Sequence, residues 1–227
     1  MPSQIPLPLE TKPALTRDAF IVSEANRDAL AFVESWPAWA TATAGLYGPA
    51  GSGKTHLAEI WIAASGAQRV EAAALSGSAF VLLDRQAPVV IENVDLSLPN
   101  PARDAAVFDL LESATVATPV LLTGREPPSA WQTALPDLRS RFQALVSFSL
   151  WIPDDDLLRK LARKLLSDRQ LAVPEATIDQ MLLRLERSPA GLRAFIARAD
   201  AKALAEGRAV TAALVRELLN EESASAE

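Results

Sequence analysis

The sequence contains no cysteine and a single histidine, His56, among its 227 residues. These shortages exclude a disulfide framework and a thiolate zinc site, and they argue against a metal centre built from histidines. No uninterrupted apolar run reaches the roughly 18 residues that span a bilayer, and residues 1–20 lack the pattern of a secretory signal peptide. We therefore expect a protein of a reducing, cytoplasmic setting that has no membrane partner.

Positive charge is also scarce. Lysine and arginine number 22 against 28 aspartate and glutamate residues, so the formal net charge is −6. Direct binding to a DNA duplex normally relies on a basic excess that neutralises phosphates. We therefore expect no direct sequence-specific DNA binding. Apolar residues, in contrast, make up 49% of the chain, which is ample for a globular core.

The hydrophobic pattern changes once along the chain. Before residue 153, short apolar runs that end near residues 47, 92, 124 and 150 alternate with helical segments, which predicts an α/β fold with a parallel sheet. After residue 153 the pattern is helical throughout. We predict a tail over 1–15, an α/β domain over 16–152, a small all-helical domain over 153–220 and a disordered tail over 221–227.

The segment GPAGSGKT, from Gly48 to Thr55, matches the P-loop pattern in full and follows a predicted strand and opens a predicted helix. Its glycines let backbone N–H groups turn toward phosphate oxygens, Lys54 reaches the β- and γ-phosphates, and Thr55 offers its hydroxyl to Mg²⁺. The motif predicts binding of ATP or ADP with Mg²⁺ at Gly48, Gly51, Ser52, Gly53, Lys54 and Thr55. An ordinary glycine-rich turn is the alternative, and the strand-to-helix context disfavours it.

Two polar residues, Glu92 and Asn93, follow the apolar run at 89–91. A P-loop site needs an acidic residue at the end of a neighbouring strand, so Glu92 is the candidate on the metal side. Asn93 stands where an active ATPase commonly has a carboxylate, and an amide cannot take a proton from water. The pair predicts a site that holds nucleotide and turns it over poorly, although both residues are also ordinary at a strand end. We interpret His56 as a first-turn helix residue with no catalytic role.

Taken with the P-loop, the segments LLTGREPP (121–128), LPDLRSRF (135–142), GLRAF (191–195) and QIPLPL (4–9) resemble the AAA+ family, and within it the DnaA-related regulators. The resemblance extends from residue 4 to about residue 219. It implies an AAA+ P-loop domain that is followed by a helical lid.

The resemblance also assigns roles to single residues. It implies that Thr123 and Arg193 lie at the two sensor positions near the nucleotide, and that Asn26 belongs to a segment that packs against adenine. It places Arg141 at the arginine-finger position, from which it would act on the ATP of a neighbouring protein. The alternative for each arginine is a solvated surface charge that contributes about 1 kcal/mol or less to stability.

The proline-rich stretch QIPLPL is similar to short peptides that bind the sliding clamp of DNA polymerase. Gln4 would make polar contacts, and apolar subsites would accept Ile5, Leu7 and Leu9. The alternative is an arm that packs on its own domain.

The resemblance therefore implies a clamp-tethered adaptor that stimulates ATP hydrolysis by DnaA and prevents over-initiation of chromosome replication. We expect the chain not to be an initiator, because no DNA-reading helix-turn-helix follows the lid. A self-sufficient AAA+ ATPase, such as a helicase loader or transposition helper, stays open as an alternative, and so does a homo-oligomer. A P-loop kinase is disfavoured because no acceptor site is recognisable.

Overall fold

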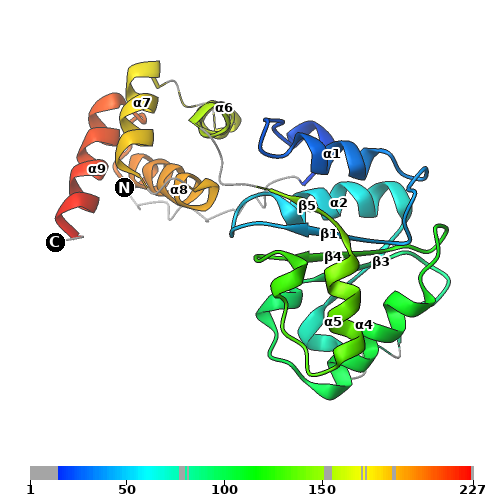
Figure 1. Cartoon of the computed structure of the whole chain (residues 1–227). Helices are drawn as coiled ribbons and strands as arrows, with labels where there is room; N and C mark the ends of the chain where they lie inside the picture. The colour runs from blue at the N-terminus through cyan, green and yellow to red at the C-terminus, as the bar shows by residue number, and fades with distance from the viewer. Residues whose placement is uncertain are drawn as a thin grey trace. The chain divides into compact units, whose positions relative to one another are not determined.

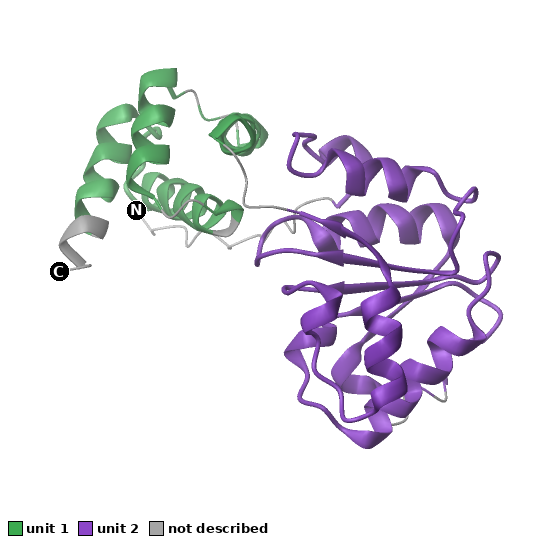
Figure 2. Ribbon diagram, in the orientation of Figure 1, with its two compact units in different colours: residues 1–14, 153–227 green, residues 15–152 purple. Residues whose placement is uncertain are grey.

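The computed structural model describes residues 15–76, 80, 82–150, 155–169, 171, 173–185 and 188–225. These residues form two compact units, one spanning 15–152 and one that contains the described residues from 155 onward (Figure 2). The predicted clamp-binding residues Gln4, Ile5, Leu7 and Leu9 lie outside the described residues. No helix in the described part of the chain is long and apolar enough to cross a membrane.

The first unit contains, in chain order, η1 (Arg17–Ala19), α1 (Arg27–Glu34), β1 (Thr43–Tyr47), α2 (Lys54–Ser65), β2 (Gln68–Glu71), η2 (Ala72–Ser76), β3 (Val89–Glu92), η3 (Val94–Leu96), α4 (Pro101–Ser113), β4 (Val120–Gly124), η4 (Pro128–Ala130), α5 (Pro136–Ala144) and β5 (Val146–Ser149), where η marks a short 3-10 helix. The second unit contains α6 (Asp155–Asp168), α7 (Glu175–Arg184), α8 (Pro189–Ala205) and α9 (Ala212–Ser225).

The first unit is built on a five-stranded parallel sheet with the order β2-β3-β4-β1-β5 (Figure 1). The predicted α/β fold is confirmed, and four of the strands are those that the sequence predicts. The edge strand β2 was not predicted. Tyr47, at the end of β1, lies opposite Gly124 of β4 and Ser149 of β5, so these three strands end together. The segments that follow the strands therefore gather at one edge of the sheet.

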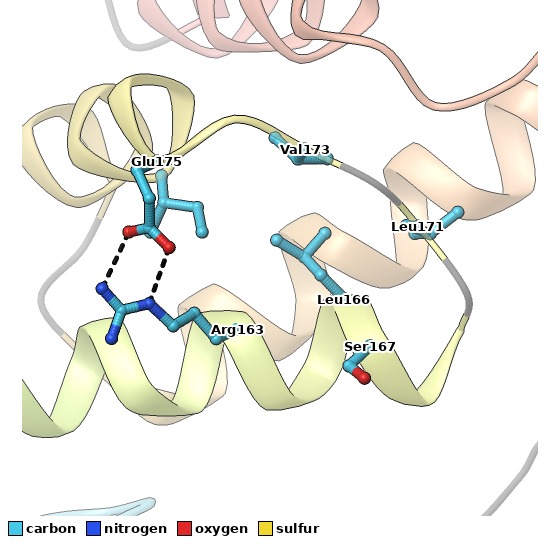
Figure 3. Close-up of a pocket in the computed structure, with 7 residues that line it drawn as sticks. Arg163, Leu166, Ser167, Leu171, Val173 and Glu175 are labelled. Atoms are coloured by element: carbon cyan, nitrogen blue, oxygen red, sulfur yellow. Dashed lines mark hydrogen bonds and ion pairs between the residues drawn. The ribbon is translucent and has the colours of Figure 1, made fainter.

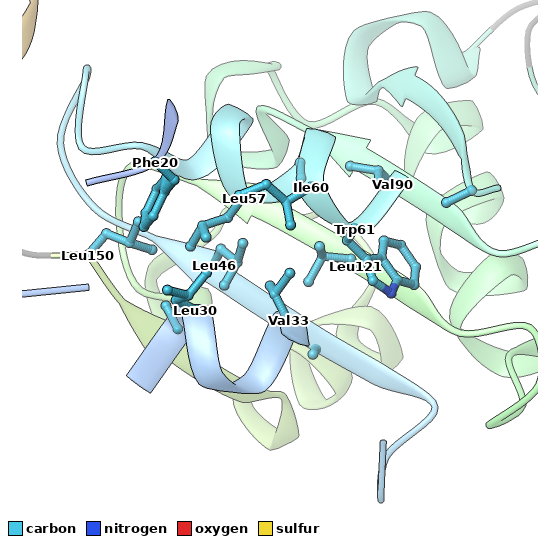
Figure 4. Close-up of a cluster of buried hydrophobic side chains, with 14 of the residues drawn as sticks. Phe20, Leu30, Val33, Leu46, Leu57, Ile60, Trp61, Val90, Leu121 and Leu150 are labelled. Carbon is cyan, nitrogen blue, oxygen red and sulfur yellow. The ribbon is translucent and has the colours of Figure 1, made fainter. Parts of the chain in front are cut away.

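Side chains alternate between the two faces of the sheet, and helices cover both faces. Val90 and Leu121 belong to a core cluster that includes side chains of α1 and α2 (Figure 4). Their chain neighbours Ile91 and Leu122 belong to a second cluster, which includes side chains of α4 and α5. Because successive residues of a strand point to opposite faces, α2 and α5 lie on opposite sides of the sheet. Figure 1 shows this layering.

The second unit is helical, as the sequence predicts. In α6, buried Leu158, Leu161 and Leu165 recur every three or four residues and form one apolar face. Arg163 of α6 donates two hydrogen bonds to the carboxylate of Glu175, at 2.8 and 2.9 Å, beside a pocket of about 340 Å³ (Figure 3). Helix α9 continues to Ser225, so residues 221–225 are helical where the sequence analysis expected disorder.

Candidate functional site

The P-loop connects the end of β1 to the start of α2, as the motif predicts. Gly48, Gly51 and Gly53 have positive φ values of 151°, 76° and 106°. A Cβ atom on Gly48 would lie 2.1 Å from the carbonyl oxygen of Leu150, so only glycine fits there. The loop opens into the N-terminus of a twelve-residue helix whose first N–H groups carry partial positive charge. This combination is suited to an anion.

Lys54, the first residue of α2, is turned back onto the loop. Its Nζ atom donates to the carbonyl oxygens of Gly48 at 2.6 Å and Pro49 at 2.9 Å, and the residue is only 8% exposed. Burial lowers the pKa of Lys54, and this effect is partly offset by the nearby carboxylates of Asp95 and Glu92. The ammonium group is thus held at the loop by two neutral carbonyl groups. A charged phosphate oxygen is a stronger hydrogen-bond acceptor and could replace them.

Thr55 and Glu92 meet across 37 positions of sequence. Thr55 Oγ1 donates to Glu92 Oε2 at 3.0 Å, and Glu92 is 4% exposed. The other oxygen, Oε1, forms an ion pair with Arg69 Nε at 3.2 Å but accepts no hydrogen bond from a described residue. A hydroxyl and a carboxylate with a spare lone pair are ligands that suit Mg²⁺. The described residues contain no group of three acidic, cysteine or histidine side chains that could hold a metal without further ligands.

Asn93 and Thr123 lie beside this pair, at the ends of neighbouring strands. The backbone N–H of Asn93 donates to Thr123 Oγ1 at 3.2 Å, and Thr123 is 1% exposed. The Asn93 side chain donates from Nδ2 to Glu71 Oε2 at 2.9 Å. Five of the residues predicted from the sequence, Lys54, Thr55, Glu92, Asn93 and Thr123, are therefore gathered at the edge where the parallel strands end.

The structure adds Asp95 to this edge, a residue that the sequence analysis missed. Its Oδ2 atom accepts from the backbone N–H groups of Arg125 at 2.6 Å and Glu126 at 2.8 Å, so it holds the segment that follows β4. Asp95 is also the strongest of the charges that favour the protonated form of Lys54. The segment ENVD places a third polar side chain two positions after Asn93, which marks Asp95 as a residue near the strand end but does not show its partners.

Asn26 directly precedes α1, and its side chain stabilises the turn before the helix without a capping hydrogen bond to the helix itself. Its Oδ1 accepts from the N–H of Ser23 and its Nδ2 donates to the carbonyl of Ile21, both at 2.9 Å. These polar atoms serve the protein backbone, and contact of this segment with adenine stays a prediction. His56 lies in the first turn of α2, with Nε2 at 2.8 Å from the carbonyl oxygen of Thr16 and its ring 5.0 Å from that of Phe20. The histidine therefore joins the segment before α1 to the P-loop helix.

Arg141 lies on α5, on the opposite side of the sheet from the P-loop helix. Its guanidinium forms an ion pair with Glu112 and lies 5.7 Å from the centre of the Phe108 ring, and the side chain is 45% exposed. Both partners belong to α4. The residue is therefore an exposed cation that is held by α4, and its action on a neighbouring ATP stays a prediction.

Arg193 lies on α8, in the second unit. Its Nε atom is buried and has no hydrogen-bond partner in the described part of the chain, and burial lowers the pKa of the guanidinium. A buried donor without a partner costs about 1–3 kcal/mol, or more when it is charged. This is a position at which an anionic ligand would be stabilising, and the sensor role stays a prediction.

No protein-family model matches the chain. An uncharacterized protein of Haemophilus influenzae is 26% identical over 190 residues, which are 77% of this chain and 80% of the relative.

Solved structures are more informative. Domain III of the replication initiation protein DnaA from Thermotoga maritima matches with a TM-score of 0.75 at 18% identity, over 92% of this chain and 97% of that one. This chain therefore shares the fold of that domain. RuvB of Thermotoga maritima matches with a TM-score of 0.71 at 19% identity, over 91% of this chain and 71% of that one. AMPPCP-bound DnaA from Aquifex aeolicus matches with a TM-score of 0.71 at 17% identity, over 84% of this chain. The chain spans only 64% to 66% of the longer initiator structures that it matches.

Proposed function

We propose that this protein is a nucleotide-binding AAA+ adaptor that resembles the DnaA-related regulator Hda. In this proposal the chain binds the DNA polymerase sliding clamp through Gln4, Ile5, Leu7 and Leu9. It then presents Arg141 to the ATP of DnaA and stimulates its hydrolysis, which prevents over-initiation of chromosome replication.

The geometry of the P-loop supports the nucleotide-binding part. Backbone N–H groups of residues 51–53 and the start of α2 would surround the phosphates, and Lys54 would exchange its carbonyl partners for phosphate oxygens. Thr55 and Glu92 would hold Mg²⁺, which neutralises phosphate charge when it is bound. The AMPPCP in the Aquifex aeolicus structure is a further reason to expect ATP or ADP here.

The observation that carries the trans-acting part is the location of Arg141. It projects from α5, its partners are Glu112 and Phe108, and the P-loop helix packs on the other face of the sheet. A guanidinium in this place is poorly located for its own nucleotide and is accessible to a second protein. Arginine is suited to this role because its planar donors match phosphate oxygens.

The presence of an amide at position 93 is a reason to expect slow hydrolysis of the nucleotide that the chain itself binds. An amide orients water but accepts no proton from it, and a positioned base is typically worth about 10²- to 10⁴-fold in rate. The alternative, a self-sufficient ATPase, requires rapid hydrolysis by the isolated chain.

The test compares the rate of ATP hydrolysis by DnaA alone, by this protein alone, and by the mixture with and without the sliding clamp. The proposal predicts that the mixture with clamp hydrolyses ATP much faster than the sum of its parts. Rapid hydrolysis by this protein alone, with no stimulation of DnaA, would favour the self-sufficient ATPase.

A further inference from the structure

Asn93 is held on both sides by the neighbouring strands. Its side-chain Nδ2 donates to Glu71 Oε2 at 2.9 Å, and its backbone N–H donates to Thr123 Oγ1 at 3.2 Å. Glu71 is the last residue of β2 and lies opposite Glu92 in the strand register, so the sheet itself places it beside Asn93. The contact therefore depends on the pairing of β2 with β3, in which the paired residues are 21 positions apart in the sequence.

The hydrogen bond to Glu71 fixes which way the Asn93 amide faces. Carboxylate oxygens only accept, so the NH₂ group must point to Glu71 and the amide oxygen must point away from it. The backbone of Asn93 is in the left-handed region, with φ 59° and ψ 44°, which asparagine tolerates better than most residues. Both the backbone and the side chain are thus held in one arrangement.

Whether the site can deprotonate water depends on which of the two positions, 71 or 93, carries the carboxylate. A hydrolytic P-loop site needs a carboxylate next to the metal ligand, where it can orient and deprotonate water. Here the carboxylate stands on β2 and the amide stands next to Glu92. An equivalent hydrogen bond would form if the two groups changed places, and the carboxylate would then directly follow Glu92 at the end of β3.

We propose that Glu71 is a positioning residue that holds the side-chain amide of Asn93 in one orientation. We further propose that the Glu71–Asn93 pair suppresses hydrolysis of the nucleotide bound to the chain itself. This inference rests on the proposed nucleotide binding. It gives the adaptor a means to keep its own nucleotide while Arg141 acts on the nucleotide of a partner.

The test exchanges the two functional groups with isosteric substitutions, Glu71→Gln together with Asn93→Asp. The double variant retains a hydrogen bond between positions 71 and 93 but moves the carboxylate next to Glu92. We expect its rate of ATP hydrolysis to exceed that of the wild type by about 10²-fold or more, the typical effect of a positioned base. Asn93→Asp alone brings two carboxylates to hydrogen-bond distance, where they repel, so its rate should lie well below that of the double variant. Glu71→Gln alone removes the carboxylate from position 71 without placing one at position 93, so its rate should also lie well below that of the double variant.

Nucleotide affinity, measured by calorimetry, separates this inference from the proposed function. If the wild-type protein shows no measurable affinity for ATP or ADP, the proposed nucleotide site itself is overturned. Tight binding with a double variant no faster than the wild type would overturn the role of the pair alone, and so would a single Asn93→Asp variant as fast as the double variant. If the double variant does not fold, Glu71→Ala with Asn93→Asp also separates the carboxylate from its like-charged neighbour and should show the same increase.

Discussion

Replacement of Lys54 by alanine should abolish the stabilisation that nucleotide gives to the protein. In the structure, the ammonium group lies on the P-loop and donates to two carbonyl oxygens at 2.6 and 2.9 Å, from which it can turn to a phosphate. A ligand at a hundredfold excess over its dissociation constant stabilises a protein by about 2.7 kcal/mol. For a chain of this size, each kcal/mol of stabilisation raises the melting temperature by about 2–4 °C. Nucleotide should therefore raise the melting temperature of the wild type by roughly 5–11 °C.

The assay is a thermal melt of each variant with and without ATP or ADP and Mg²⁺. Lys160→Ala is the matched control, because Lys160 is an exposed lysine of α6 that pairs with Asp156 on its own helix. The control should show the wild-type shift, and Lys54→Ala should show almost none. An equal shift in Lys54→Ala and the control would refute the reasoning.

Three further predictions follow from other parts of the chain. The unfolded chain should hold more protons than the folded one between the lowered pKa of Lys54 and its ordinary value of 10.5. The free energy of unfolding of the nucleotide-free protein should therefore rise with pH across that window, and denaturant titrations should show a smaller rise for Lys54→Met. Deletion of residues 4–9 should eliminate co-elution with the sliding clamp and leave nucleotide affinity and melting temperature unchanged. If the deletion instead lowers the melting temperature and leaves clamp binding intact, residues 4–9 are an arm that packs on its own domain. Phe142→Ala, at a position 1% exposed and 5.1 Å from the Trp131 ring, should lower the free energy of unfolding by about 3–5 kcal/mol, and an unchanged denaturant midpoint would contradict that packing.

The parts of the fold that the sequence predicts are those whose signal is local. The P-loop is a contiguous motif, and the strands β1, β3, β4 and β5 lie in short segments that contain several apolar residues and are bounded by turns or helices. Strand β2 was missed because its four residues, QRVE, contain one buried side chain, Val70. What makes this segment a strand is its pairing with β3, which a short polar stretch does not reveal.

The same distinction applies to the site. The residues of the P-loop and the Glu92–Asn93 pair could be predicted because motif spacing places them. Glu71 could not, because strand register brings it to Asn93 from the missed strand. Asp95 has its partners about thirty positions further along the chain. Local sequence patterns do not specify contacts of this kind.

A second exposed arginine, Arg85, makes contacts similar to those of Arg141. Arg85 has nearly the same surroundings, since it pairs with Asp109 of α4 and lies 5.0 Å from the centre of the Phe80 ring. The two arginines differ in that only Arg141 stands in the segment that resembles the arginine-finger motif. Arg85 is therefore a matched control for the removal of an exposed, α4-paired guanidinium.

The most direct test of the proposed function measures ATP hydrolysis by DnaA in the presence of the sliding clamp and either Arg141→Ala or Arg85→Ala. Arginine fingers are worth about 10³- to 10⁵-fold in rate, so Arg141→Ala should lose nearly all stimulation, while Arg85→Ala should retain it. Both variants should bind nucleotide as the wild type does. Stimulation by Arg141→Ala equal to that of Arg85→Ala would contradict the account.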